Sequence, residues 1–215
     1  MYCVITLTYY YFICYLNIQE PVIIENLGLV DSASKWDLDY LTANMGPEEK
    51  TILISETPKF TYFNERKCPS FPNFKPVSHE VSMKMEDFVS KFRTWKPGDN
   101  HLYFQKPLTS SAGPRIYQDF RDFRWEWLNE KKKRLNWGNL TNNLLLIGQP
   151  GNITTVHYDE QENLFAQVHG YKRVMLFHPK FFQCLYPYQV HHPCDRQSQV
   201  KKILIVVVYF PYRLA

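Results

Sequence analysis

Asn143-Leu-Leu-Leu-Ile-Gly-Gln-Pro-Gly-Asn-Ile-Thr-Thr-Val-His-Tyr-Asp159 is the stretch of sequence that decides the fold. Leu144 to Ile147 form an apolar run that can be buried as a strand. The residues from Gly148 to Gly151 combine glycine and proline, which is typical of a tight turn. The β-branched residues from Ile153 to Val156 then favour a second strand. We therefore predict a strand, a turn and a second strand.

His157 and Asp159 lie two residues apart at the end of the second predicted strand. Alternate side chains of a strand point to the same side, so the imidazole and the carboxylate are expected to share a face. With one further histidine they would form the two-histidine, one-carboxylate site that suits non-haem Fe(II) and leaves positions open for substrates. The alternative is a hydrogen-bonded surface pair without a metal, because this spacing alone is weak evidence.

The chain that follows is predicted to turn at His169-Gly170 and to return as a strand over residues 171–177. Three residues of this strand would share a face: Lys172, Val174 and Leu176. Burying a lysine among apolar residues is costly unless an anion meets it. The pattern therefore indicates a cation suited to a carboxylate. In the alternative interpretation, Lys172 lies at the strand end and extends into water.

Longer motifs along the chain carry a family resemblance. They are Lys35-Trp-Asp-Leu-Asp-Tyr-Leu41, Asn73-Phe-Lys-Pro76, Trp137-Gly-Asn-Leu-Thr141, Gly151-Asn-Ile-Thr-Thr-Val-His-Tyr-Asp-Glu-Gln-Glu-Asn163, Phe165-Ala-Gln167, Gly170-Tyr-Lys-Arg173 and Cys184-Leu-Tyr-Pro-Tyr-Gln-Val-His-His-Pro-Cys-Asp-Arg-Gln-Ser-Gln-Val200. Over about residues 20–200 the chain resembles the asparaginyl hydroxylases of the JmjC/cupin superfamily, the group of factor inhibiting hypoxia-inducible factor. The resemblance implies an oxidoreductase that uses Fe(II), 2-oxoglutarate and O2.

The resemblance also implies roles for particular residues. The iron ligands would be His157 and Asp159. Lys172 would pair with the distal carboxylate of 2-oxoglutarate, and three more residues would lie at this cosubstrate: Tyr103, Thr154 and Asn163. Positions that contact the peptide substrate in the family are matched by Tyr62, Arg196 and Gln197. The expected partner is a protein with a target asparagine, such as hypoxia-inducible factor or an ankyrin-repeat protein.

Composition and charge bound the remaining expectations. The chain has 215 residues, 45% of them hydrophobic and 21% charged, which is typical of a packed globular protein. Its net charge of +4 is spread out, and the basic run at residues 131–134 is interpreted as a solvated helix end, so no nucleic-acid partner is expected. Five cysteines without a Cys-x-x-Cys motif favour a reducing compartment, the cytoplasm and nucleus. The apolar residues 1–16 are short for a membrane span, and no membrane association is expected.

The expected fold class is α+β, mainly β: a partial double-stranded β-helix of the JmjC/cupin type, with N-terminal helices packed on it. Helices are expected near residues 34–45, 85–92 and 120–127, and strands near 51–55, 59–63 and 101–105. The expected divisions are 1–18, an unmatched apolar segment; 19–142, the N-terminal α/β part; 143–200, the first strands of the β-helix; and 201–215, an unmatched apolar tail.

The resemblance ends at Val200, before the family's second iron histidine and its dimerisation helices. The third iron ligand is therefore expected to be missing, and this 215-residue chain is predicted to be inactive as written. Three interpretations stay open. They are an incomplete sequence of an asparaginyl hydroxylase, a non-catalytic fragment or isoform that binds peptide or cosubstrate weakly, and a JmjC hydroxylase of other residue specificity.

Overall fold

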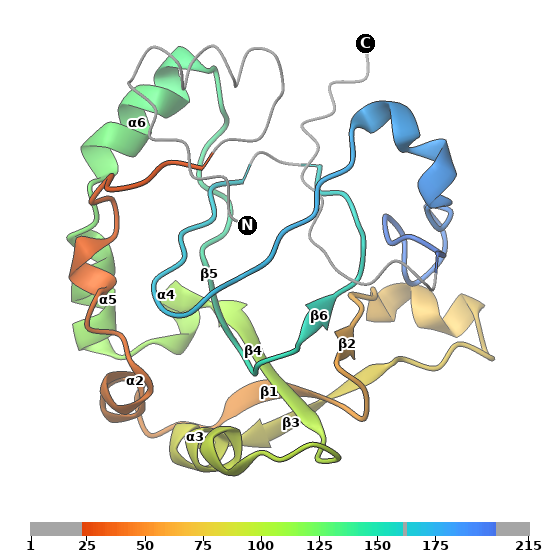
Figure 1. Ribbon diagram of the computed structural model, residues 1–215, viewed down its shortest axis with the longest axis horizontal. Coiled ribbons are helices and arrows are strands. Elements are labelled where there is room, and N and C mark those ends of the chain that lie inside the picture. The colour runs from red at the N-terminus through yellow and green to blue at the C-terminus, as the bar shows by residue number, and fades with distance from the viewer. Residues whose placement is uncertain (1–22, 161–162, 201–215) are drawn as a thin grey trace.

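Four antiparallel strands form the central sheet of the computed structural model, which describes residues 23–160 and 163–200 (Figure 1). Their order across the sheet is β3-β1-β4-β5, with the bounds Ser78–Met83, Lys50–Ser55, His101–Pro107 and Leu144–Gly148. In the register of the sheet, Ile52 pairs with Val81 and Phe104 pairs with Ile147. The predicted strand at residues 144–147 is thus confirmed as β5, and its partner is β4.

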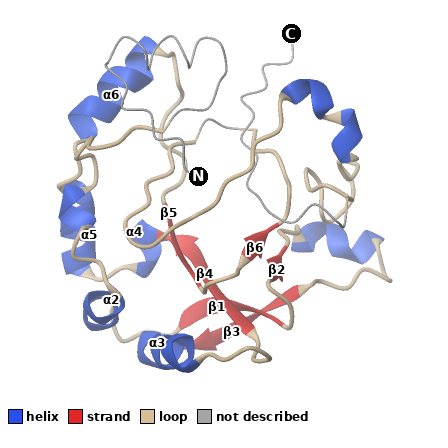
Figure 2. Cartoon of the chain, viewed as in Figure 1, coloured by secondary structure: helices blue, strands red, loops and turns tan. Residues whose placement is uncertain are grey.

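Two short parallel strands, β2 (Lys59–Phe60) and β6 (Ile153–Thr154), make a second sheet. Figure 2 shows them on the opposite side of the four-stranded sheet from helices α2 and α5. The second predicted strand is therefore shorter than expected. Among the described residues, pairing resumes after it in two isolated antiparallel bridges, between His157 and Gln197 and between Pro187 and Ser198.

Helices from the first part of the chain pack beside the central sheet (Figure 2). The α-helices are α2 (Leu38–Asn44), α3 (Met85–Thr94), α4 (Leu108–Ser111), α5 (Pro114–Arg121) and α6 (Trp125–Arg134), and the 3-10 helices are η1 (Asp31–Ala33), η2 (Glu65–Ser70), η3 (Pro179–Phe181) and η4 (Gln183–Leu185). Helix α2 begins after Asp37, whose side chain accepts a hydrogen bond from the backbone N of Tyr40. The helix therefore begins at Leu38, later than the expected start near residue 34.

The main core lies between these helices and the central sheet. Its buried residues come from both layers: Ala33, Trp36, Leu41, Met45, Ile52, Met83, Met85, Phe88, Val89, Leu102, Phe104, Leu108 and Ile116. Helix α3 contributes side chains at helical spacing, and its Phe88 contacts Phe104 of β4 with ring centroids 6.4 Å apart. Residues from separate segments thus form one continuous apolar interior, which fixes the position of the sheet.

A buried carboxylate, Asp119 of α5, ties the first helices to this core. It accepts hydrogen bonds from Trp36 Nε1 at 2.9 Å and from the Tyr40 hydroxyl at 2.7 Å. Lys35 Nζ lies 2.8 Å from its other oxygen. Burial tends to raise the pKa of Asp119, but the hydrogen bonds from Lys35, Trp36 and Tyr40 outweigh this and lower the pKa.

Two side-chain amides close the end of β4 where β5 stops. The backbone N of Leu102 donates to Gln149 Oε1 at 2.7 Å, and Asn152 Nδ2 donates to the backbone O of Leu102 at 2.7 Å. Asn152 also contacts the His101 ring at 3.0 Å. The turn after Gly148 therefore continues the pattern of the sheet with side chains in place of backbone.

Most elements of the first half were predicted, and the fold class is confirmed as α+β. One strand, β3, was not among the expected elements, and Lys84 is the residue that precedes helix α3. The single helix expected near residues 120–127 is two, because α5 ends at Arg121 and α6 begins at Trp125. The basic run lies at the end of α6 as expected, but its first residue, Lys131, is 1% exposed and therefore not solvated.

The hairpin expected after Asp159 is not formed as a pair of strands. Gly170 has a φ of +72° at the expected turn, but residues 163–177 contain no strand in the structure. The physical reason is that a strand needs a partner for its backbone, and among the described residues this segment has none. The segments expected to be unmatched, residues 1–18 and 201–215, lie wholly or almost wholly outside the described residues. No helix within residues 23–160 and 163–200 is long and apolar enough to cross a membrane.

Candidate metal and cosubstrate site

His157 and Asp159 point to the same side of the chain, as the two-residue spacing predicts. His157 Nε2 lies 3.8 Å from Asp159 Oδ1. Their side chains are 14% and 31% exposed, so the pair lies in a partly enclosed position with access from solvent. The bridge to Gln197 holds the backbone at His157, and the backbone N of Tyr158 donates to Arg196 O at 3.2 Å.

Hydrogen bonds to the outer atoms of the pair orient the two inner atoms. His157 Nδ1 lies 2.8 Å from the backbone O of Thr155. A carbonyl oxygen can only accept, so Nδ1 carries a proton, and Nε2 is the nitrogen that could serve as a metal ligand. Asn163 Nδ2 donates to Asp159 Oδ2 at 2.8 Å, which leaves Oδ1 toward His157.

This arrangement fits two ligands of a divalent metal. A divalent cation placed between Nε2 and Oδ1 would be bound by both atoms. With metal–ligand bonds of about 2.1 Å, two ligands at a right angle lie about 3.0 Å apart, so the observed 3.8 Å requires a small approach. Hydrogen bonds to the far side of a histidine and a carboxylate are the usual support for metal ligands. Within the described residues, no group of three His, Cys, Asp or Glu side chains could hold a metal.

Gln197 pairs with His157 through the isolated bridge, and its side chain does not face solvent. It is 3% exposed, and its Oε1 accepts a hydrogen bond from the Thr155 hydroxyl at 2.7 Å. Its backbone O accepts from Tyr188 N at 2.9 Å. A side chain buried in this way does not present itself to a peptide, so the expected substrate contact of Gln197 does not agree with its position.

Tyr62 and Arg196, the other two expected substrate residues, lie together on the surface. The Arg196 guanidinium is 5.9 Å from the centre of the Tyr62 ring, and Tyr62 is 54% exposed. Arg196 has a φ of +66°, and the adjacent Asp195 forms an ion pair with Lys67 at 3.1 Å. This ion pair joins the loop that carries Tyr62 to the loop that carries Arg196. The role of the surface in substrate binding stays a prediction.

The residues expected at the cosubstrate are only partly brought together. Burial raises the pKa of Tyr103, while a hydrogen bond with the Thr154 side chain acts in the opposite direction, so these two hydroxyls are neighbours. Asn163 is next to Asp159, as described above. Lys172, however, has its Nζ 4.2 Å from the centre of the Phe165 ring, and burial lowers its pKa.

The expected position of Lys172 is therefore not observed. Its contact is with Phe165, and the structure gives it no hydrogen bond with Tyr103 or Thr154 within the described residues. The reason is the same as for the missing hairpin, because the strand that would carry Lys172 across to β4 is not formed. The predicted role of Lys172 at a carboxylate stays a prediction.

Sequence reasoning missed the residues that support this site. Gln149 and Asn152 lie in a segment interpreted only as a turn, Lys67 lies in η2, and Asp195 lies in a loop. Their functions depend on contacts between residues that are distant in sequence, such as Lys67 and Asp195. The one available signal was the concentration of polar residues in the motif at 194–199.

The chain matches the model of a family described as "Cupin-like domain" over residues 10–207. Curated relatives include tRNA wybutosine-synthesizing protein 5 of Mus musculus, which is 25% identical over 180 residues, covering 78% of this chain and 52% of the relative. Lysine-specific demethylase 8 of Danio rerio is 26% identical over 183 residues (81% and 39%). Bifunctional peptidase and (3S)-lysyl hydroxylase JMJD7 of Homo sapiens is 27% identical over 185 residues (83% and 54%). The chain thus spans about half the length of these relatives, or less.

These relatives correct the narrower resemblance. The similarity is to wybutosine-synthesizing proteins and JmjC proteins, and not to factor inhibiting hypoxia-inducible factor. The prediction of that particular hydroxylase, and with it the asparagine specificity and the hypoxia response, is therefore wrong. The physical reason is that a His-x-Asp pair with its neighbouring polar residues is a requirement of the metal site, and it does not define which substrate is used.

Proposed function

The chain belongs to the family of cupin-like domains, and from this premise we propose that it is an oxygenase domain of the JmjC type that uses Fe(II), 2-oxoglutarate and O2. One observation supports the proposal above all others: His157 Nε2 and Asp159 Oδ1 lie 3.8 Å apart on one side of the chain. Hydrogen bonds to their outer atoms hold both side chains in place. A distance of 3.8 Å is too long for a direct hydrogen bond between these two atoms, and a metal ion can be bound by both of them.

Particular residues of the chain would have the following roles in this activity. His157 and Asp159 would hold the metal, and Thr155 O and Asn163 would keep these two side chains oriented. The Tyr103 and Thr154 hydroxyls would donate hydrogen bonds to a carboxylate of 2-oxoglutarate. Bound Fe(II) would supply the activation of O2 and the coupled oxidation of 2-oxoglutarate to succinate and CO2.

Lys172 would complete the carboxylate site by moving from Phe165 to the side of Tyr103. Its pKa is lowered by burial in the present position, so an anion nearby would stabilise the ammonium form. The exposed pair of Tyr62 and Arg196 would receive the substrate. The names of the relatives, which refer to tRNA and to lysine, favour a residue or nucleoside within a macromolecule as the group that is oxidised.

Metal binding tests this proposal directly. Mn(II) serves as a probe because it occupies Fe(II) sites without oxidising, and its affinity can be measured by titration calorimetry. We expect His157→Ala and Asp159→Ala each to weaken Mn(II) binding by about tenfold or more, because each removes a ligand. His169→Ala is the matched control, since His169 is exposed and lies outside the site.

Turnover gives the second test. Any Fe(II)-dependent conversion of 2-oxoglutarate to succinate should be lost in His157→Ala and kept in His169→Ala. Equal Mn(II) affinity in the wild-type protein and His157→Ala would contradict the proposal, because the metal would then be bound elsewhere. Thermal unfolding of all three variants establishes that the ligand substitutions leave the fold intact.

A further inference from the structure

A cavity of the described structure lies away from the metal pair. It has a volume of about 690 Å³ and lies between the loop over residues 70–77 and the segment over residues 187–200. Residues Ile153 and Thr155 line it, whereas Thr154 between them is hydrogen-bonded with Tyr103. Because neighbouring residues of a strand point to opposite sides, β6 separates this cavity from the proposed cosubstrate site.

One wall of the cavity is aromatic. The rings of Tyr188 and His192 are stacked, with centroids 4.0 Å apart and planes 13° apart. Phe71 meets His192 edge-on at 4.9 Å, and Phe74 does so at 5.8 Å. Aromatic rings of this kind can pack against the planar ring of a ligand, face to face or edge to face.

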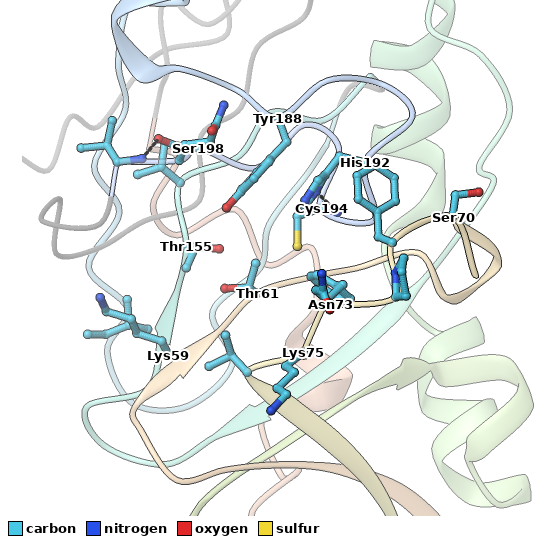
Figure 3. Close-up of a pocket in the computed structure, with 18 residues that line it drawn as sticks. Lys59, Thr61, Ser70, Asn73, Lys75, Thr155, Tyr188, His192, Cys194 and Ser198 are labelled. Carbon is cyan, nitrogen blue, oxygen red and sulfur yellow. Dashed lines mark hydrogen bonds between the residues drawn. The ribbon is translucent and has the colours of Figure 1, made fainter. Parts of the chain in front are cut away.

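Polar groups converge beside this wall. Figure 3 shows the hydroxyls of Thr61, Thr155 and Tyr188 pointing into one space, with the Cys194 thiol next to them. The Thr155 hydroxyl donates to Gln197, but the Thr61 and Tyr188 hydroxyls have no hydrogen-bond partner within the described residues. These two hydroxyls are therefore available to a ligand.

The protonation states make the centre of the cavity a source of donors. Burial raises the pKa of Tyr188, so its hydroxyl keeps its proton at neutral pH. Burial likewise raises the pKa of the Cys194 thiol to about 11, so no thiolate is present. His192 Nδ1 accepts from the backbone N of Cys194 at 2.9 Å, and burial lowers the pKa of the ring. The neutral ring therefore carries its proton on Nε2.

The charged side chains that line the cavity are both lysines. Lys59 and Lys75 are at its edge (Figure 3). Among the lining residues that the structure describes, none is an aspartate or a glutamate. Asp195, whose charge acts on His192 and Cys194, forms an ion pair with Lys67, so electrostatic complementarity at the cavity edge favours a negatively charged ligand.

We propose that this cavity binds a small aromatic carboxylate, with its ring against Tyr188 and His192 and its carboxylate at the Thr61 and Tyr188 hydroxyls near Lys59 and Lys75. The volume lies within the range of about 300–1,000 Å³ that small-molecule sites occupy. The inference is independent of the proposed oxygenase activity, because the two sites lie on opposite sides of β6.

The probe for this site is 2-naphthoate, and 2-naphthamide is its uncharged control. Titration calorimetry on the full chain should show that the naphthoate binds about tenfold or more tightly than the amide, since the charge contributes to its hydrogen bonds. Tyr188→Phe and Thr61→Val should each weaken naphthoate binding about three- to tenfold, and Lys75→Gln should weaken it about threefold. Lys96→Gln, a surface lysine in a distant turn, is the matched control and should bind as the wild type does.

Two further measurements separate this site from the proposed metal site. Naphthoate should bind His157→Ala with unchanged affinity, and 2-oxoglutarate should not displace it. The proposal is overturned if the amide binds as tightly as the naphthoate, if 2-oxoglutarate competes, or if no naphthoate binding is detected. It is also overturned if Tyr188→Phe, Thr61→Val and Lys75→Gln, shown by circular dichroism to be folded, all bind like the wild type.

Discussion

The two halves of the molecule are held together by different means. Residues 23–148 form the four strands of the central sheet, the short strand β2, five α-helices and two 3-10 helices around one apolar interior, with Asp119 as a buried polar centre. Residues 149–160 and 163–200 form one two-residue strand, two short 3-10 helices and a small cluster around Val156 and Leu185. The second half is therefore kept in place mainly by hydrogen bonds between loops, and by few apolar contacts.

Exposed apolar side chains mark the same difference. Eight large ones lie in the second half: Leu164, Phe165, Tyr171, Val174, Leu176, Phe181, Tyr186 and Val190. Nevertheless, this half carries His157, Asp159 and half of the residues that line the cavity. The metal pair is therefore formed on the less packed half, and the cavity is formed between the two halves. The tightly packed half supplies the support on which these loops rest.

The largest expected effect lies in the packed half. Phe104→Ala removes a side chain with no exposed surface from the main core, so we expect a loss of about 3–5 kcal/mol in the free energy of unfolding. Leu185→Ala in the smaller cluster should cost about 2 kcal/mol, at the lower end for such changes. Urea unfolding followed by tryptophan fluorescence measures both. Equal losses would show that the two halves are packed alike, and Tyr171→Ser, at a residue 92% exposed, is the control.

The next largest loss in the free energy of unfolding is expected at Asp119, the polar centre of the packed half. Asp119→Asn removes the charge that Lys35, Trp36 and Tyr40 contact, and should lower the free energy of unfolding by about 2 kcal/mol. The pKa of Asp119 is lowered from its usual 3.8 in the folded protein. Its contribution is thus present above that pH and is lost as the pH falls through the folded pKa. The variant should lack this part of the acid dependence, and unchanged acid unfolding would argue against the ion pair.

The smallest effect on stability is expected behind the metal pair. Gln197→Ala removes the acceptor of the Thr155 hydroxyl and should cost about 1–2 kcal/mol. The change should be local: the NMR signals of the His157 ring should broaden or shift, while those of the main core stay in place. Gln183→Ala, at an exposed glutamine, is the matched control. A uniform change across the molecule would show that the two halves unfold together.

Sequence reasoning was most successful where one local pattern decides the structure. The apolar run at residues 144–147 lies in β5. Met85, Phe88 and Val89, which have helical spacing, lie in α3. The shared face of His157 and Asp159 followed from strand alternation even though the strand itself is short. In these cases the periodicity of the side chains is enough to give the answer.

The rest depended on contacts that no local pattern contains. β3 is exposed at His79, Glu80 and Ser82 and lacks a clear apolar alternation, and its pairing with β1 is what makes it a strand. The segment with Lys172 has strand-like composition, yet it lacks a paired neighbour within the described residues. The resemblance implied a substrate contact for Gln197, but it could not predict the burial of this side chain or its hydrogen bond with Thr155.

The side chains of Gln149 and Asn152 at the end of β4 affect whether a second copy of the chain can add a strand to the sheet at this point. An open strand edge offers free N–H and C=O groups, and a second chain can add to it and start aggregation. At Leu102 both groups are already occupied, because the N–H donates to Gln149 and the C=O accepts from Asn152. Where β5 ends, the sheet therefore offers no template for strand addition, and the turn that leads to His157 also protects the protein from self-association at this point.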